Sequence, residues 1–121
     1  MGLCWFLGFL FVDGTFADLV VVDVSRVYRV PSHLSDVEAA CLPLAGVTAF
    51  RALFVKGLLE EGQTLLVPGI GSGVSQFVAM FAVQAGANVW VTSSSDKKIE
   101  IAKDLFGIRG GVNYKTDKVL C

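Results

Sequence analysis

The chain has 121 residues, enough for one globular domain, and 54% of them are hydrophobic while 17% are charged. Its net charge of -1, with no basic cluster beyond Lys97-Lys98, gives no electrostatic basis for binding nucleic acid or an anionic membrane. The cysteines, Cys4, Cys41 and Cys121, lack metal-ligand spacing, so we expect no zinc site or disulfide framework within this chain and a reducing, cytoplasmic setting.

Residues 1–12 form an apolar run that lacks the basic start and the cleavage site of a signal peptide. The run is also too short for a membrane span, which needs about 20 apolar residues. A buried strand and a segment foreign to the following fold are both open, and we favour the second. Membrane association through this run is a weaker alternative.

Residues 13–34 favour extended structure. Asp13-Gly14 indicates a turn, Phe16–Val22 is rich in β-forming residues, and Arg26–Val30 alternates apolar and polar residues. Pro31 ends the second run because it has no N–H to donate to a sheet. We expect two strands in this part of the chain.

A helix is expected to follow. Ser35 and Glu38 have the spacing of a capping box, in which each residue satisfies a backbone N–H of the other. Pro43 is expected to break or restart the helix, because it lacks an N–H and its ring crowds the preceding turn. Thr48–Val55 then continues helically until Gly57.

The rest of the chain alternates strands and helices. The runs 64–67 and 88–92 are apolar enough to suggest strands buried on both faces, and a third strand is expected at 112–114. The intervening segments 74–85 and 96–106 carry apolar residues at helical spacing. The order βαβαβ predicts an α/β fold with a parallel sheet and right-handed crossovers.

A glycine-rich turn, Gly69-Ile70-Gly71-Ser72-Gly73, joins the first of these strands to its helix. A dinucleotide pyrophosphate needs close backbone N–H groups and a helix N-terminus, and glycines permit that approach. Val74 stands where G-x-G-x-x-G has its third glycine, and the hexamer alone is as consistent with an ordinary loop. The strand before it and the helix and strand after it favour a nucleotide-binding turn.

The end of the second strand bears on the choice of cofactor. It carries Thr92-Ser93-Ser94-Ser95 rather than the Asp or Glu that binds the ribose 2′-hydroxyl in NAD-preferring folds. Hydroxyls followed by Lys97 and Lys98 suit a 2′-phosphate, so NADP(H) is favoured over NAD(H). Alternatively, the serines cap the second helix and the lysines are solvated. Asp96 is expected in the first helical turn rather than at the ribose.

Three segments resemble the medium-chain dehydrogenase/reductase superfamily, and above all its zinc-type alcohol dehydrogenase-like and quinone oxidoreductase-like members. They are DGTFAD at 13–18, LPLAGVTAF at 42–50 and Asn113-Tyr114. The resemblance covers residues 13 to about 118. It implies that 1–12 lie outside the family pattern, that 13–34 are terminal strands of a GroES-like catalytic domain, and that 35–121 form the first half of an NADP-binding Rossmann domain.

The resemblance also implies a set of cofactor contacts. They are Thr48 near the nicotinamide, Gly69, Gly71, Gly73 and Val74 at the pyrophosphate, and Ser94, Lys98 and Tyr114 at the 2′-phosphate. Thr48 and Tyr114 are equally consistent with ordinary packed or hydrogen-bonded residues.

The Gly-His-Glu segment, the zinc ligands and the second half of the Rossmann sheet of the family have no match in these residues. We therefore assign no catalytic residue, and expect His33, the one histidine, in a solvent-facing turn. The resemblance implies NADP(H)-dependent hydride transfer to or from a carbonyl, enone, quinone or alcohol by a longer protein, with this truncated chain inactive alone. The alternative is a non-catalytic nucleotide-binding or interaction module. A small-molecule substrate is implied, and homo-oligomerisation is left open.

Overall fold

The computed structural model describes residues 16–117. The expectations for residues 1–12 and for the Asp13-Gly14 turn lie outside the described residues. Internal contacts divide the chain into two compact units, Met1–Val47 and Thr48–Cys121, which are considered separately below. The domain boundary expected at residue 35 stays a prediction.

The two strands expected before residue 31 do not form. The backbone is extended at Val27 (φ -106°, ψ 126°), but the only regular element there is a 3-10 turn at Val24–Arg26 (η1). Within residues 16–117, strand pairing involves only three strands, all beyond residue 63. Phe16, Leu19 and Val21 are almost fully exposed. The expectation was wrong because β-forming side chains do not make a strand without a partner to receive the backbone hydrogen bonds.

The capping box is confirmed at the start of α1 (Asp36–Cys41). The Glu38 N–H donates to the Ser35 hydroxyl oxygen over 3.3 Å, and the Ser35 N–H donates to the Glu38 carboxylate over 2.9 Å. Two N–H groups that the first turn leaves without helical partners are thereby satisfied.

Pro43 does not break the helix, contrary to expectation. The chain passes through it as a π-helical turn, Leu42–Gly46 (η2), in which the Val47 N–H donates to the Leu42 carbonyl five residues back. A wider turn accommodates the proline ring and the missing N–H, which a regular α-helix does not. The helix therefore continues as Val47–Phe50 (α2) and Arg51–Lys56 (η3), as expected for this stretch.

This helical segment, Asp36–Lys56, is the one helix among residues 16–117 that is long and apolar enough to cross a membrane, with 21 residues and a mean hydropathy of 1.5. Core helices of globular proteins meet the same criteria of length and composition, so the segment by itself does not indicate a membrane. Gly57 ends it, as expected, and its N–H donates to the Ala52 carbonyl over 2.8 Å.

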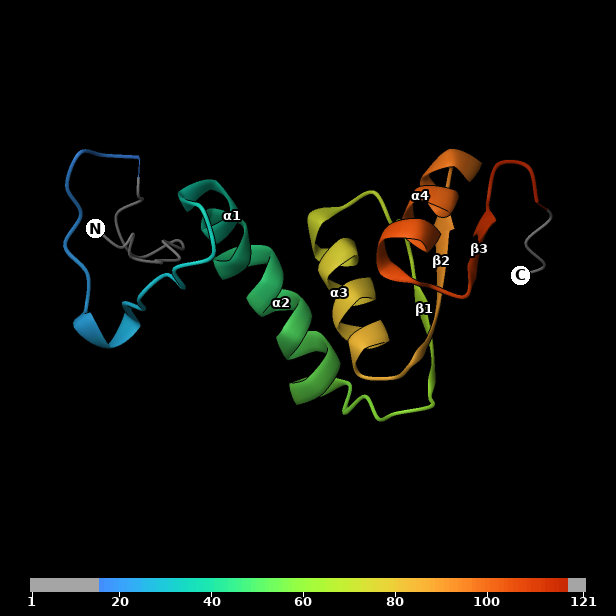
Figure 1. Ribbon diagram of the computed structural model, residues 1–121, viewed down its shortest axis with the longest axis horizontal. Helices are drawn as coiled ribbons and strands as arrows, with labels where there is room; N and C mark the ends of the chain where they lie inside the picture. The colour runs from blue at the N-terminus through green and yellow to red at the C-terminus, as the bar shows by residue number, and fades with distance from the viewer. Residues whose placement is uncertain (1–15, 118–121) are drawn as a thin grey trace. The chain divides into compact units, whose positions relative to one another are not determined.

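Beyond residue 63 the expected βαβαβ order is confirmed (Figure 1). The elements are β1 (Thr64–Val67), α3 (Gly73–Gln84), β2 (Asn88–Ser93), α4 (Asp96–Phe106) and β3 (Gly110–Asn113). The sheet order is β1-β2-β3, and both pairings are parallel. All three strands therefore end at the same edge of the sheet.

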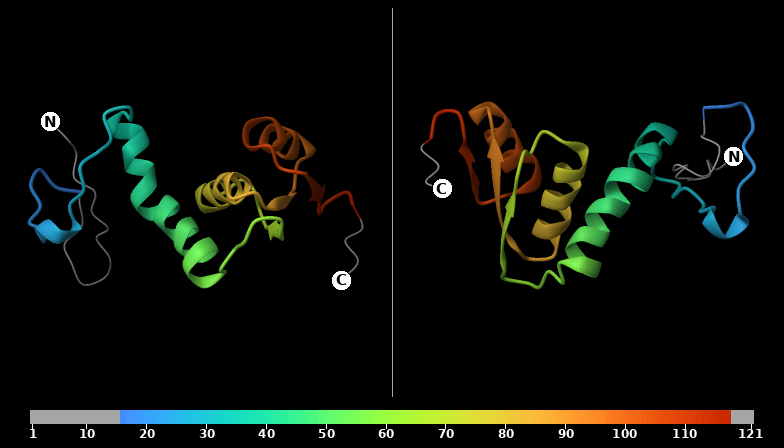
Figure 2. Two further views of the ribbon diagram at one scale, coloured as in Figure 1. Left: turned by 60° about the horizontal axis from the view of Figure 1, so that its bottom comes forward. Right: turned by 180° about the vertical axis from the view of Figure 1, so that it is seen from behind.

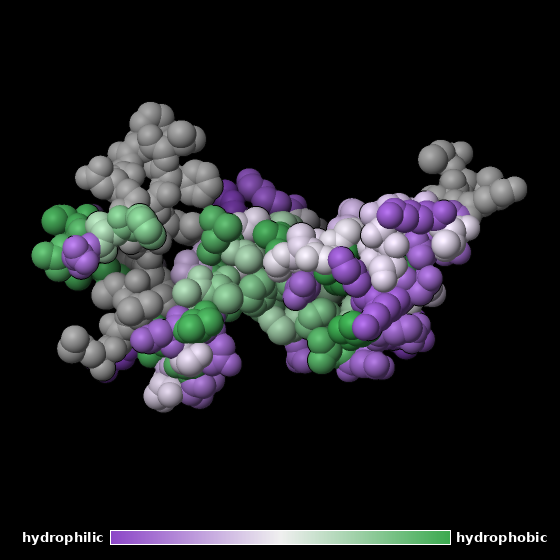
Figure 3. Space-filling model, turned by 90° about the horizontal axis from the view of Figure 1, so that it is seen from above, coloured by the Kyte–Doolittle hydropathy of each residue, from purple (hydrophilic) through white to green (hydrophobic). Residues whose placement is uncertain are grey.

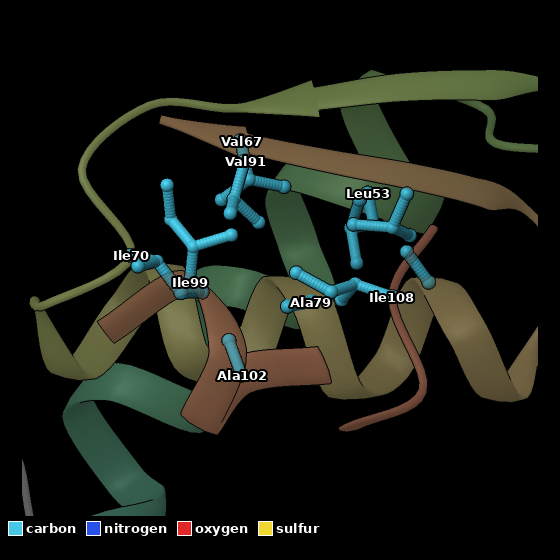
Figure 4. Packing of buried hydrophobic residues seen from close by; sticks show 10 residues of the cluster. Leu53, Val67, Ile70, Ala79, Val91, Ile99, Ala102 and Ile108 are labelled. Atoms are coloured by element: carbon cyan, nitrogen blue, oxygen red, sulfur yellow. The ribbon is translucent and has the colours of Figure 1, made fainter. Parts of the chain in front are cut away.

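The core lies between this sheet and the helices that cover one of its faces, α3 and α4 (Figures 2 and 4). Val89 and Val91 of β2 are fully buried at its centre, because β2 is the middle strand. The remaining buried members of the cluster are Leu53, Val67, Ile70, Ala79, Ala82, Ile99, Ala102 and Ile108.

The opposite face of the sheet is open, which corrects the expectation of strands buried on both faces. Leu66 and its register partner Trp90 are 60% and 44% exposed. The Trp90 ring lies over Gly110 of β3, where an added Cβ would come within 2.9 Å of it. The apolar composition of β1 and β2 correctly indicated strands, but only one face is covered within the described residues.

The capping box makes a prediction about pH. Hydrogen bonds from the Ser35 hydroxyl and then the Ser35 N–H hold the pKa of Glu38 below its ordinary value of 4.5. Because the folded pKa is depressed, the stabilisation is present above the unfolded pKa and is lost as pH falls through the folded value. An NMR titration should place the Glu38 midpoint below 4.5, and Ser35→Ala should move it up. An unchanged midpoint in Ser35→Ala would contradict the capping geometry.

The packing of β3 predicts a contrast between two neighbouring glycines. An added Cβ at Gly111 would lie 2.8 Å from side-chain atoms of both Ile99 and Val91 and 2.9 Å from the Val91 carbonyl oxygen. Gly111→Ala should therefore destabilise the fold by about 1–3 kcal/mol through overpacking. Gly110→Ala should cost about 0.5 kcal/mol or less, because only the half-exposed Trp90 ring must move.

Urea unfolding followed by far-UV circular dichroism would measure both variants. Equal losses of stability in the two variants would show that the helix-covered face of the sheet is not packed as described.

Candidate functional site

The glycine turn leaves β1 at its carboxyl end. Gly69 adopts φ +65°, the left-handed region that residues with a Cβ rarely enter, and this reverses the chain after Pro68. Ile70 then points into the core and is 3% exposed. The turn is thus anchored by one apolar side chain, while Gly69 and Gly71 on either side of it are exposed.

Thr92, near the end of the neighbouring strand β2, fixes the path of the turn with two hydrogen bonds. The Gly69 N–H donates to the Thr92 hydroxyl oxygen over 3.1 Å, and the Ile70 N–H donates to the Thr92 carbonyl over 3.0 Å. The Gly69 N–H is therefore already engaged within the protein. Gly69 contributes its backbone conformation to the turn rather than a free donor.

Two serines close the start of α3. Ser72 is its N-cap, and its hydroxyl oxygen accepts the Ser75 N–H over 3.1 Å. The Ser75 hydroxyl donates to the Pro68 carbonyl over 3.2 Å and lies 2.7 Å from the Ser72 hydroxyl. These bonds tie the first turn of α3 back to the end of β1, so the helix N-terminus has a fixed position.

Three N–H groups at this helix start remain without a hydrogen-bond partner among residues 16–117: those of Gly71, Gly73 and Val74. Unpaired N–H groups at the N-terminus of a helix carry partial positive charge and form a binding place for anions. Because Gly71 has no side chain, an anion can approach its backbone closely.

Lys98 of α4 lies beside the same turn. A Cβ added to Gly71 would lie 3.4 Å from the Lys98 Nζ, so the ammonium stands next to the unpaired Gly71 N–H. Within the described residues, no carboxylate pairs with this ammonium. A cation and a set of N–H donors therefore converge where no anionic group of the described chain is present.

The serines after β2 do not cap α4 through their hydroxyls. Ser95 occupies the N-cap position but makes no side-chain cap bond, and its N–H donates to the buried Ser93 hydroxyl oxygen over 3.2 Å. Ser94 is half-buried, and its hydroxyl has no hydrogen-bond partner within residues 16–117. The capping alternative is thus wrong for Ser95, whereas Asp96 lies in the first turn of α4 as expected.

Tyr114 follows β3 at the same edge of the sheet. Its N–H donates to the Ser93 carbonyl over 3.1 Å, and its side chain is 52% exposed. The preceding residue, Asn113, is buried. The exposure of the Tyr114 ring excludes the interpretation of Tyr114 as a packed core residue.

The structure therefore brings seven of the eight sequence-predicted residues to the carboxyl edge of the sheet. Figure 3 looks onto this edge, where weakly polar and charged residues dominate the surface around the strand ends. Thr48 is exposed on α2 and makes no hydrogen bond to the turn within the described residues. His33 is exposed in a turn, as expected.

Two residues that shape this edge were not singled out from the sequence. Thr92 was noted only as one hydroxyl in a run, although a threonine two residues before a helix cap is placed to reach the neighbouring turn. Asn113 was noted only as part of the Asn113-Tyr114 pair, and its buried amide became visible only with the fold.

A parallel βαβαβ unit, with a glycine turn and free N–H groups at the carboxyl end of its first strand, defines the dinucleotide-binding class of α/β proteins. No family model matches the chain. It is 45% identical over 105 residues to the zinc-type alcohol dehydrogenase-like protein YogA of Leptosphaeria maculans, which covers 86% of this chain and 29% of that protein. A second relative, the zinc-type alcohol dehydrogenase-like protein C1773.06c of Schizosaccharomyces pombe, is 46% identical over 85% of this chain and 30% of its own length.

Solved structures agree. A putative alcohol dehydrogenase from Sinorhizobium meliloti superposes with a TM-score of 0.74 at 38% identity, over 82% of this chain and 28% of that one. An NAD-dependent alcohol dehydrogenase superposes with a TM-score of 0.78 at 36% identity, over 84% and 29%. The chain belongs to the medium-chain dehydrogenase/reductase superfamily of oxidoreductases. It spans about three tenths of the length of the curated relatives it matches.

The role of Thr92 can be tested without a ligand. Thr92→Val removes the acceptor for the Gly69 N–H but keeps the backbone acceptor for Ile70. Hydrogen exchange at Gly69 should accelerate about fivefold, the effect of losing about 1 kcal/mol, while exchange at Ile70 changes little. Thr92→Ser is the matched control and should exchange like the unmodified chain. If Thr92→Val left Gly69 exchange unchanged, the hydroxyl would not hold the turn.

Proposed function

We propose that this chain is the cofactor-binding part of a medium-chain dehydrogenase/reductase that binds a nicotinamide dinucleotide, NADP(H) in preference to NAD(H). The observation that carries the proposal is the convergence of the unpaired N–H groups of Gly71, Gly73 and Val74 with the Lys98 ammonium. The whole protein would transfer a hydride to or from a carbonyl, enone, quinone or alcohol, as a cytoplasmic enzyme.

The fit of these residues to a dinucleotide rests on their chemistry. A pyrophosphate carries negative charge on several oxygens that accept hydrogen bonds, and the start of α3 offers donors in that pattern. The space above Gly71, which a Cβ would partly fill, allows a phosphate to reach the backbone. Lys98 adds a full positive charge to the partial charge of the helix end.

The preference for NADP(H) is supported by what surrounds the second strand end. Neither Ser94 nor Ser95 can accept two hydrogen bonds from a ribose diol as a carboxylate does, and the Ser94 hydroxyl is free to donate. Related structures include both an NAD-dependent alcohol dehydrogenase and a mycobacterial protein solved with NADPH, the latter with a TM-score of 0.69 at 29% identity. The choice between the cofactors therefore depends on the residues of this chain.

Within the reaction, the bound nicotinamide supplies or accepts the hydride. The described residues have a binding and orienting role: the turn fixes the pyrophosphate, and thereby the distance from it at which the nicotinamide lies. None of the described residues is assigned as an acid, base or metal ligand, and no group of three or more His, Cys, Asp or Glu residues gathers within 16–117. This chain alone should bind cofactor without turnover.

Lys98 provides the test of the proposal. Lys98→Met should weaken NADPH binding about tenfold or more, because a charge-assisted hydrogen bond to phosphate contributes about 1.5–3 kcal/mol. NADH binding should fall less, since NADH lacks the 2′-phosphate. Lys103→Met, in the last turn of the same helix, is the matched control and should leave both affinities unchanged.

Affinities would be measured by calorimetric titration of the purified 121-residue chain. Failure of the folded chain to bind either cofactor would refute the proposed function. Equal losses for NADPH and NADH in Lys98→Met would place the ammonium at the pyrophosphate alone and remove its support for NADP(H) selectivity.

A further inference from the structure

The side chain of Asn113 is a buried polar group that the proposed function does not use. It is 4% exposed and ends β3 at the carboxyl edge of the sheet. Its Nδ2 donates to the Asp96 carboxylate over 3.1 Å, and its Oδ1 accepts the Lys115 N–H over 3.1 Å. Its backbone N–H donates to the Asp117 carboxylate over 2.9 Å. A buried amide with this many partners has one fixed orientation.

Asp96 is the acidic residue closest in sequence to the end of β2, where NAD-preferring folds carry their ribose-binding acid. It is exposed in the first turn of α4, where a carboxylate also interacts favourably with the helix N-terminus. Lys98 is two positions further along the same helix, and residues two apart do not face each other on a helix. Asn113 is therefore the partner that determines the direction of the Asp96 carboxylate.

Asp96 stands next to the residues proposed to meet a 2′-phosphate. Ser94 precedes it by two positions and Lys98 follows it by two, while Tyr114 follows Asn113 directly. A phosphate monoester carries a charge of about -1.5 to -2 at neutral pH. A carboxylate that swung toward it would repel it, and the repulsion between charges several ångströms apart at a protein surface is large enough to change affinity.

We propose that Asn113 is a positioning residue for cofactor selection: it holds the Asp96 carboxylate within the first turn of α4 and so keeps negative charge away from the 2′-phosphate. This inference rests on the proposed function, because it concerns the NADP(H) preference of the same edge. The same side chain fixes the backbone on both sides of Tyr114 through the Lys115 N–H, so that one buried amide organises the acidic and the aromatic neighbour together.

The sharpest test changes Asp96, which is exposed and can be replaced without disturbing the core. Asp96→Glu keeps the charge but displaces the carboxylate by one methylene from the Asn113 amide, and it should lower the NADPH-over-NADH preference about threefold through repulsion. Asp96→Asn removes the charge while its side-chain oxygen can still accept from Asn113, and it should maintain or raise that preference. Calorimetric titration of both cofactors with the full 121-residue chain would give the ratio.

Asn113→Leu removes the restraint itself and should lower the preference about fivefold, because the ionised Asp96 is then free to turn. Adding Asp96→Asn to this variant should restore the preference to within about twofold of Asp96→Asn alone, since no charge is left to repel the phosphate. Circular dichroism would confirm that each variant is folded. If Asn113→Leu does not fold, the comparison of Asp96→Glu with Asp96→Asn decides.

The outcomes separate this inference from the proposed function. An unmodified chain that prefers NADPH, together with equal ratios in Asp96→Glu and Asp96→Asn, would overturn the inference alone. Parallel loss of NADPH and NADH binding in Asn113→Leu would show a purely structural role. An unmodified chain that binds neither cofactor would overturn both. In the ligand-free chain, the Asn113 side-chain amide resonances should shift in Asp96→Glu, and unchanged resonances would show that the hydrogen bond is absent.

Discussion

The carboxyl edge of the sheet depends on the pair of hydrogen bonds between Thr92 and the glycine turn. The parallel register sets Val67 opposite Val91, so Thr92 lies beside the chain as it leaves β1. Its hydroxyl and carbonyl oxygens take up the N–H groups of Gly69 and Ile70. With those donors occupied, the donors left over are the ones that point away from the sheet at the start of α3. The selection of which N–H groups are free is thus made by a residue of the neighbouring strand.

The fold beyond residue 63 could be read from the sequence because its signals are local. Apolar runs of strand length alternate with apolar residues at helical spacing, and glycine or serine stands at each junction. The third strand begins two residues earlier than expected, at Gly110, because glycines carry no β-forming side chain and their place in the sheet comes from Trp90 and Val91 opposite.

The earlier part of the chain was read less well, for two different reasons. The residues before Pro31 have the composition of strands, but strand formation requires a partner, which composition does not report. Pro43 was expected to interrupt a helix because the rule for proline assumes α-helical geometry. The chain uses the wider π-helical turn instead, and nothing in the neighbouring residues announces that choice.

The candidate site divides along the same line. The glycine turn, Lys98 and the first-turn position of Asp96 follow from spacing within one stretch of chain. The contacts of Thr92 with Gly69 and of Asn113 with Asp96 join residues 23 and 17 positions apart, and they exist only because parallel strands end together. Sequence patterns indicate which chemical groups are present at such an edge. They do not indicate which donors are already used within the protein.

The bare face of the sheet gives the molecule an optical property. Trp90 is the one tryptophan among residues 16–117, and its indole lies half in solvent against the flat surface of Gly110. Any body that came to cover Leu66 and its neighbours would remove water from that ring. The emission of Trp90 would then move to shorter wavelength and would report occupancy of this face, independently of events at the glycine turn.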